Sequence, residues 1–208
     1  MVTSSLQLGA DRKGDPTICT PHQEGLVVAA VDDDADYQYL ADRDLASHME
    51  CVGELHFLDD GDHFVNFVVD RVRSGRIPDV VLSDVRMNRL DGIEAVQTLI
   101  REVGSVVRDK MKLVFWSTGL GGEVCARELG VLLQKEPWIL GIVGKEDPAP
   151  WGDLLNVVVG SREESAASIA NLRRATRKFF DTRGYGHLLS EDFVGLESVD
   201  GDAHSFVG

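Results

Sequence analysis

Short apolar runs that alternate with stretches of helical periodicity restrict the fold of this chain more than any other feature. Five runs are short enough for one buried strand each, at residues 26–31, 54–58, 80–83, 112–117 and 139–143. Between them, apolar side chains recur three and four positions apart, which is the spacing of an amphipathic helix. This alternation is typical of βαβ units, in which helices cover a parallel sheet. The sequence therefore predicts an α/β fold built on five parallel strands.

The helix after the fourth run is expected to be short. It would occupy residues 123–129, and residues 131–138, which include Pro137, would form a long connection to the fifth strand. A further helix at residues 151–159 would close the domain.

Composition divides the chain into three parts. Residues 1–24 are rich in Thr, Ser, Gly, Asp and Pro and lack an apolar period, so we interpret them as a flexible tail. Residues 25–159 carry the alternating pattern, and residues 160–208 hold one more amphipathic helix, which begins after Ser161, and an acidic, Gly-containing tail. At 208 residues and 43% hydrophobic content, the chain supports one globular core with a small appendage.

The balance of charge limits the classes of partner. The chain carries a formal net charge of -14 at pH 7, and its pI is ≈ 4.7. A protein that binds DNA or RNA by neutralising phosphates needs a basic face, so DNA binding is not expected.

Cysteine usage and hydropathy indicate a cytoplasmic protein. Cys19, Cys51 and Cys125 are far apart and form no CxxC pair, which argues against a disulfide framework and a zinc site and fits a reducing compartment. Charged residues between Asp11 and Asp15 interrupt the N-terminal segment, so no signal peptide is expected. No apolar stretch is long enough to cross a bilayer, so no membrane contact is expected.

Aspartates follow two of the predicted strands. Asp32, Asp33 and Asp34 come directly after the first run, and Asp84 ends the third. If these strands are parallel neighbours, their carboxyl ends meet at one edge of the sheet, where open α/β folds bind ligands. Clustered carboxylates raise each other's pKa unless a cation is present. Since Mg²⁺ prefers a few carboxylates together with waters and phosphate oxygens, the sequence predicts a Mg²⁺ site here.

These aspartates belong to an ordered set of motifs that resembles the receiver domain of two-component response regulators, the CheY-like family. The resemblance covers residues 26–159. The matching motifs, in chain order, are Val31-Asp32-Asp33, Pro78-Asp79-Val80-Val81-Leu82-Ser83-Asp84, Met87 with Asp91-Gly92, Thr118 and Lys145.

The resemblance implies a fold and a reaction. The fold would be the doubly wound, flavodoxin-like receiver fold with strand order 2-1-3-4-5, here followed by a C-terminal helix. Asp84 matches the phosphoacceptor, which takes a phosphoryl group from a phosphohistidine. The donor would be a sensor histidine kinase or a histidine phosphotransfer protein.

The resemblance also assigns the neighbouring residues. Asp32 and Asp33, together with Asp84 and the backbone carbonyl of Arg86, match the groups that hold Mg²⁺. Thr118 matches the hydroxyl that hydrogen-bonds a phosphoryl oxygen, and Lys145 matches the ammonium that pairs with another. A cation, a hydroxyl and an ammonium would neutralise the transferred group from three sides, as phosphoryl transfer requires.

Three positions depart from the family pattern. Ile142 stands where an aromatic residue is usual, Glu146 replaces the proline that follows the lysine, and Asn88 replaces another proline. Ile142 removes the usual coupling between the hydroxyl residue and the aromatic rotamer, so a different output surface is expected.

A phosphatase of the haloacid-dehalogenase-like type is the alternative enzyme reading. Its groups would be Asp32 as nucleophile, Asp34 as acid, Ser117 or Thr118 as hydroxyl, Lys145 as phosphate ligand and Asp147 as metal ligand. This reading leaves Asp84 without a role. A pseudo-receiver, which keeps the fold and binds partners without phosphorylation, is a third reading, and the intact acidic set argues against it.

The part of the chain after Gly160 is short for a helix-turn-helix output domain. Output through a downstream protein partner or a homodimer is therefore expected. The C-terminal helix is the candidate effector surface.

Overall fold

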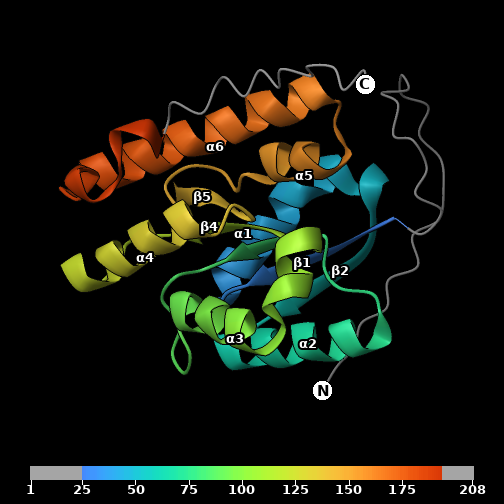
Figure 1. Ribbon diagram of the computed structural model, residues 1–208. Coiled ribbons are helices and arrows are strands. Elements are labelled where there is room, and N and C mark those ends of the chain that lie inside the picture. Colours follow the sequence, from blue (N-terminus) through green and yellow to red (C-terminus); the bar gives the residue numbers. More distant parts are fainter. Residues whose placement is uncertain (1–24, 194–208) are drawn as a thin grey trace, which may run out of the picture.

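A parallel sheet forms the centre of the protein in a computed structural model that describes residues 25–193 (Figure 1). The strand order is β2-β1-β3-β4-β5, which confirms the predicted fold. The strands are β1 (Leu26–Val31), β2 (Val52–Leu58), β3 (Val80–Ser83), β4 (Lys112–Ser117) and β5 (Ile139–Gly144). The predicted tail at residues 1–24 and the final acidic segment, from residue 194, lie outside the described residues.

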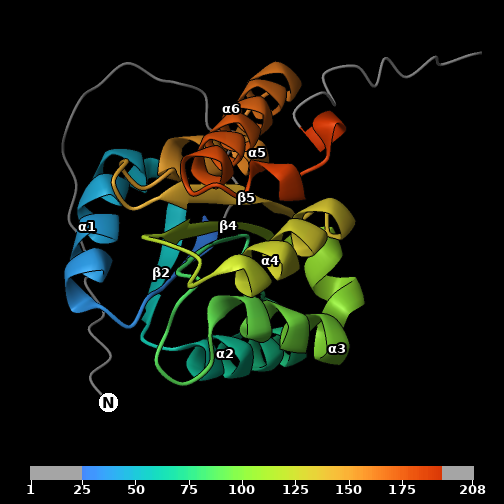
Figure 2. The ribbon, with the colours of Figure 1, turned by 90° about the vertical axis from the view of Figure 1, so that its left-hand side faces the viewer.

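Helices cover both faces of the sheet because side chains alternate between those faces along each strand. The α-helices are α1 (Ala35–Leu45), α2 (Gly61–Ser74), α3 (Gly92–Lys110), α4 (Glu123–Lys135), α5 (Trp151–Val159) and α6 (Arg162–Thr182), and the short 3-10 helices are η1 (Ala46–Cys51), η2 (Gly186–Leu188) and η3 (Glu191–Phe193). One core joins the sheet to α2, α3 and α4, and a second joins it to α1 and α5 (Figure 2). Within the described residues, no helix combines the length and apolarity that a membrane span requires.

Helix α4 is longer than the sequence analysis expected. The predicted helix at residues 123–129 continues to Lys135, so the long connection expected at residues 131–138 is wrong. The apolar stripe simply continues through Leu132 and Leu133, which are buried. The remaining turn is held by the Glu136 carboxylate, which accepts two hydrogen bonds from Arg108, at 2.7 and 2.8 Å, and one from the Trp138 indole.

Helix α6 packs along β5, the edge strand of the sheet, and against α5 (Figure 1). It starts at a capping box formed by Ser161 and Glu164, where the sequence predicted a helix start. In its middle, the Thr176 hydroxyl accepts a 2.9 Å hydrogen bond from the backbone N–H of Ile142 in β5. A Cβ on Gly141 would lie 2.2 Å from the Thr176 Oγ1, so this close approach requires glycine. The helix thus covers an edge that would otherwise expose unpaired backbone groups.

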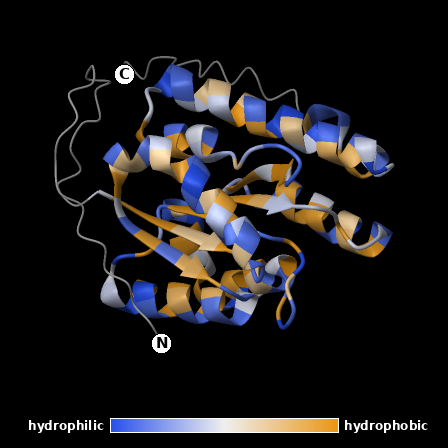
Figure 3. Ribbon diagram, turned by 180° about the vertical axis from the view of Figure 1, so that it is seen from behind, coloured by the Kyte–Doolittle hydropathy of each residue, from blue (hydrophilic) through white to orange (hydrophobic). Residues whose placement is uncertain are grey.

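Helix α6 is buried on one side and exposed on the other. Figure 3 shows apolar residues concentrated along the strands, and a mixture of polar and apolar residues along α6. Its buried residues Leu172, Phe179 and Phe180 face the domain, and charged residues such as Arg174 and Lys178 are exposed. The segment after Gly160 is therefore packed on the domain as far as residue 193.

Candidate functional site

The two aspartate clusters meet because β1 and β3 are parallel neighbours. Val31 pairs with Ser83 in the sheet, so the next residues, Asp32 and Asp84, leave the sheet side by side. The backbone N–H of Asp84 donates to the Val31 carbonyl at 2.8 Å, and that of Asp32 donates to the Leu58 carbonyl at 2.9 Å. The regular strand hydrogen bonds therefore fix the backbone of both aspartates.

Asp32, Asp33 and Asp84 form a set of hard oxygen donors. One carboxylate oxygen from each lies within 4.8 Å of the others. Mg²⁺ binds oxygens at roughly 2.0–2.1 Å, which places its ligands about 3 to 4 Å apart, so small side-chain rotations bring these oxygens to the required spacing. The donor set fits Mg²⁺ in its chemistry and its spacing.

Asp34, the third of the three consecutive aspartates, has a different structural role. The Asp34 carboxylate accepts a 2.9 Å hydrogen bond from the backbone N–H of Asp36 and caps the start of α1. Asp33, by contrast, accepts a 3.0 Å hydrogen bond from the backbone N–H of Asn88, across the site. Two of the three consecutive aspartates thus belong to the acidic cluster.

Lys145 connects the two buried carboxylates. It follows β5, and its Nζ lies 2.6 Å from the Asp32 Oδ2 and 2.6 Å from the Asp84 Oδ2. Its side chain is only 2% exposed, so water screens these ion pairs little. The ammonium thus supplies the positive charge that two adjacent carboxylates need.

Burial and pairing shift the pKa values of this group in defined directions. Burial raises the pKa of Asp32 to about 6, and the repulsion of Asp84 adds to this, although Lys145 opposes both effects. Burial acts to lower the pKa of Lys145, but its hydrogen bonds to Asp32 and Asp84 outweigh this and raise the pKa above its ordinary value. Lys145 is therefore a permanent cation, and Asp32 takes up a proton in mildly acidic solution.

The hydroxyl beside Asp84 belongs to Ser117, and not to Thr118 as the resemblance implied. The Ser117 Oγ lies 2.6 Å from the Asp84 Oδ1 and is fully buried, whereas Thr118 is exposed. The difference follows from the strand: Ser117 is the last residue of β4, and the chain turns away after it. The Ser117 hydroxyl also lies 3.0 Å from the Gly119 carbonyl, so its single proton can serve either acceptor.

Backbone groups complete the surroundings of Asp84. Its Oδ1 accepts hydrogen bonds from the backbone N–H of Val85 at 2.6 Å and of Arg86 at 3.2 Å. Arg86 therefore lies beside the site as expected, and the role of its carbonyl as a metal ligand stays a prediction. The Asp84 Oδ2 accepts from Lys145, so the carboxylate is held in one orientation by donors on both oxygens.

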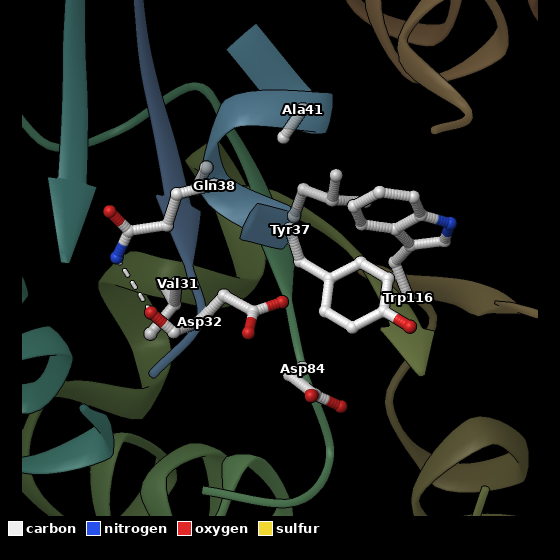
Figure 4. Close-up of a pocket in the computed structure, with 9 residues that line it drawn as sticks. Val31, Asp32, Tyr37, Gln38, Ala41, Asp84 and Trp116 are labelled. Atoms are coloured by element: carbon white, nitrogen blue, oxygen red, sulfur yellow. Dashed lines mark hydrogen bonds between the residues drawn. The ribbon is translucent and has the colours of Figure 1, made fainter. Parts of the chain in front are cut away.

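Two aromatic residues at the site were not singled out as functional from the sequence. Tyr37 in α1 and Trp116 in β4 line a small pocket beside Asp32 and Asp84 (Figure 4). The sequence analysis gave Tyr37 no role, because its position depends on how α1 leaves the end of β1. Ile142, which replaces the usual aromatic residue, is fully buried in the core and lies away from this pocket.

Mg²⁺ affinity is expected to depend on pH through Asp32. Its pKa of about 6 means that below this pH a proton must leave before the carboxylate can bind a cation. Affinity is therefore expected to fall by about tenfold per pH unit below the pKa and to level off above it. Calorimetric titration with Mg²⁺ across this range measures the effect, and the Asp32→Asn variant serves as control, since it should bind Mg²⁺ more weakly and lose this dependence. Affinity that is independent of pH in the wild-type protein would contradict the assignment.

Comparisons with known proteins identify the fold by structure. No protein-family model matches the sequence, and no curated protein matches it significantly. Solved structures do match. A two-component response regulator from Cytophaga hutchinsonii aligns with a TM-score of 0.54 at 20% identity, over 66% of this chain and 99% of that chain.

Two further structures align with lower scores. RcsB from Salmonella enterica serovar Typhimurium, bound to promoter P1flhDC in the presence of phosphomimetic BeF3-, gives a TM-score of 0.48 at 19% identity, over 79% of this chain and 70% of that chain. A two-component transcriptional regulator AraC from Clostridium phytofermentans gives 0.47 at 19% identity, over 72% and 98%. The sheet order and the alignment with the Cytophaga hutchinsonii protein agree, and the chain has the fold of a response-regulator receiver domain.

Proposed function

We propose that this protein is a phosphoacceptor of a phosphorelay, which receives a phosphoryl group on Asp84 with the help of Mg²⁺ and signals through protein contacts. One observation carries the proposal: an ammonium, a hydroxyl and two backbone N–H groups converge on the Asp84 carboxylate beside two further aspartates. The donor would be a phosphohistidine of a sensor kinase or of a phosphotransfer protein.

The transfer step uses the Asp84 carboxylate as nucleophile. One of its oxygens attacks phosphorus, the bond from phosphorus to the donor's imidazole nitrogen breaks, and the imidazole leaves with the electron pair, which gives an acyl phosphate. Asp32 and Asp33 would hold Mg²⁺ together with Asp84, and the bound ion would neutralise charge on the phosphoryl oxygens.

Lys145 and Ser117 have complementary roles in this step. The Lys145 ammonium already contacts the Asp84 Oδ2 at 2.6 Å. A short movement of its side chain would therefore bring it from this oxygen to an oxygen of the phosphoryl group on Asp84. Ser117 would donate its proton to a second phosphoryl oxygen from the opposite side of the carboxylate. This assignment moves the hydroxyl role from Thr118 to its neighbour.

The phosphatase alternative finds less support in the geometry. It requires Asp34 and Asp147 in the catalytic cluster, but Asp34 caps α1, and the Asp147 carboxylate lies 3.2 Å from the Lys178 Nζ in α6. Asp84, which that mechanism leaves without a role, accepts more hydrogen bonds from the site than Asp32 does.

Phosphorylation with a small donor tests the proposal. The wild-type protein is incubated with Mg²⁺ and acetyl phosphate, and the phosphorylated residue is located by mass spectrometry after proteolysis. Label on Asp84 is the expected result. Turnover of a phosphomonoester that depends on Asp32 would favour the phosphatase, and the absence of label with either a small donor or a histidine kinase would favour a pseudo-receiver.

The contacts of α6 support this helix as the output element. Arg183, just past its C-terminal end, donates a 2.9 Å hydrogen bond to the Thr118 carbonyl and lies 3.2 Å from a carboxylate oxygen of Glu146. These two residues directly follow Ser117 and Lys145, which both contact Asp84. A movement of either group toward a phosphoryl oxygen would therefore pull on the end of α6.

Arg183→Ala is expected to weaken the connection between Asp84 and α6. Phosphorylation should change the hydrogen exchange of α6 amides in the wild-type protein, and this change should be smaller in the variant, because the bridge from Thr118 and Glu146 is missing. Exchange followed by mass spectrometry, with and without phosphorylation, measures both. Lys178→Ala is the matched comparison, because it removes an exposed ion pair between α6 and Asp147 but keeps the bridge from Arg183 to Thr118 and Glu146, so it should respond like the wild-type protein. Equal responses in the wild-type protein and both variants would rule out this route.

A further inference from the structure

The ammonium of Lys145 has an aromatic contact in addition to its two carboxylates. Its Nζ lies 3.8 Å from the centre of the Tyr37 ring and 5.8 Å from that of Trp116. Both distances fall within the range of about 6 Å over which a cation is attracted by an aromatic face, and the attraction is stronger where water is excluded. Since the Lys145 side chain is 2% exposed, the contact with Tyr37 is of the stronger kind.

The contacts of Lys145 account for all of its donors. An ammonium has three N–H groups. Asp32 and Asp84 accept two of them, and the third is left for the face of Tyr37, over which the Nζ lies. The ring therefore occupies the place where a lysine at a surface would bind water.

Tyr37 is itself held firmly at the site. It lies in the first turn of α1, whose start is capped by Asp34. The next residue, Gln38, donates a 2.6 Å hydrogen bond from its Nε2 to the backbone carbonyl of Asp32, which ties this turn to the end of β1 (Figure 4). The Tyr37 ring then meets Trp116 edge to face, with the ring centres 5.8 Å apart and the planes at 83°.

Trp116 packs against the side of Tyr37 and is itself fixed by its surroundings. Its side chain is buried in the core, and its indole N–H donates a 3.3 Å hydrogen bond to the Asp147 carbonyl, in the loop that follows Lys145. The aromatic pair thus joins α1, β4 and the loop after β5 around one ammonium. Asp32 lies between β1 and α1, Ser117 ends β4, and Lys145 directly follows β5.

We infer that Tyr37 is a positioning residue for Lys145, whose ring, backed by Trp116, keeps the ammonium beside Asp84 when Asp32 turns to bind a cation. The inference rests on the proposed phosphoryl transfer. A metal ion on Asp32 would draw negative charge away from the carboxylate that Lys145 contacts, so the attraction of one of the two anionic partners of the ammonium would weaken in the reactive state. The ring is the contact that does not change, because it takes no part in metal binding or in the transfer.

The inference predicts different results for two substitutions of the same residue. Tyr37→Phe keeps the ring and should react like the wild-type protein. Tyr37→Leu fills similar space without an aromatic face, and the rate constant for phosphorylation of Asp84 by acetyl phosphate at saturating Mg²⁺ should fall by about tenfold. Tyr39→Leu is the matched control, since Tyr39 lies in the same helix and is 67% exposed.

A spectroscopic measurement separates positioning from a general effect on structure. Protons above an aromatic face resonate upfield, so the ε-methylene protons of Lys145, observed in lysine-labelled protein, should be shifted upfield in the wild-type protein and in Tyr37→Phe. The shift should be lost in Tyr37→Leu and kept in Tyr39→Leu. Far-ultraviolet circular dichroism and thermal unfolding establish that each variant is folded.

Each outcome decides the matter. Slow phosphorylation and a lost shift in Tyr37→Leu, with Tyr37→Phe unaffected, support the inference. Phosphorylation of Tyr37→Leu at the wild-type rate overturns it and leaves the proposed function intact, whereas wild-type protein that takes no phosphate on Asp84 defeats the proposed function. If Tyr37→Leu does not fold, the wild-type spectrum decides: Lys145 protons without an upfield shift would show that the contact is absent in solution.

Discussion

Asp84→Asn is expected to lose phosphoryl acceptance completely. The amide has the shape of the carboxylate, so Ser117, Val85 and Arg86 keep an oxygen acceptor and the fold should be retained. It lacks the anionic oxygen that attacks phosphorus, and no acyl phosphate can form at this position. Lys145 loses the Asp84 Oδ2, because the amide NH2 in that place cannot accept its proton, but it keeps Asp32 as its partner, so the buried ammonium remains compensated. The loss therefore follows from the chemistry of one atom and not from a disturbed fold.

Intact-mass measurement after incubation with acetyl phosphate and Mg²⁺ gives the result directly. Asp34→Asn is the matched control, because it makes the same chemical change in the same acidic group of residues but at a helix cap, where Asn is as suitable as Asp. This control should be phosphorylated like the wild-type protein. If Asp84→Asn still acquired a phosphate on Asp32, the phosphatase assignment would replace the one proposed here.

The sheet could be predicted from the sequence because its strands are buried on both faces. Apart from Lys112 and the serines that end β3 and β4, the runs in β1, β3, β4 and β5 are apolar, and in the structure nearly every residue of these strands is buried. The weaker run at residues 54–58 is the outer strand β2, half-exposed along its length. The strength of each apolar run thus reported how far each strand is buried, and this includes the edge strand β5, which α6 covers.

The length of α4 and the packing of α6 could not be predicted in the same way. Pro137 suggested an early end for α4, but the helix ends at Lys135 and leaves the proline in the short turn that Glu136 holds through Arg108. This ion pair joins residues far apart in the chain. The place of α6 against β5 depends on Gly141 and Thr176, which meet only once both elements have formed. A single sequence contains no periodic signal for either contact.

The site shows the same division. Asp32, Asp33 and Asp84 were found from their places at strand ends, and Lys145 from the order of the motifs, and the structure brings all four together. To choose between the hydroxyls of Ser117 and Thr118, one has to know at which residue β4 ends. The exact end of a strand is the least certain property in any sequence analysis. The place of Tyr37 beside Lys145 depends on the direction in which α1 leaves the end of β1, which the sequence does not give. The charged residues of the site could thus be predicted from the sequence, whereas Ser117 and Tyr37, which contact them, could be identified only from the structure.

Ser117→Ala is expected to slow phosphorylation of Asp84 strongly, and Thr118→Val is not. The Ser117 hydroxyl is buried and donates to the acceptor carboxylate at 2.6 Å. A hydrogen bond to a charged group contributes about 1.5 to 3 kcal/mol, which corresponds to about tenfold to hundredfold in rate if it is lost in the transition state. The Thr118 side chain is exposed, so its replacement should change the rate by no more than about twofold. The backbone carbonyl of Thr118, which binds Arg183, is kept in both variants.

The two substitutions also test which of the two residues, Ser117 or Thr118, donates a hydrogen bond to the phosphoryl group on Asp84. The rate constant with acetyl phosphate is measured for both variants and for Ser117→Thr, which keeps a hydroxyl at the same position and should recover most of the activity. Because Ser117 and Thr118 are adjacent, a general weakening of the loop would slow both variants alike, and only the loss of a specific donor slows one. A slow Thr118→Val with an unaffected Ser117→Ala would mean that the loop after β4 rearranges on phosphorylation and brings Thr118 to the place that Ser117 occupies in the unphosphorylated protein.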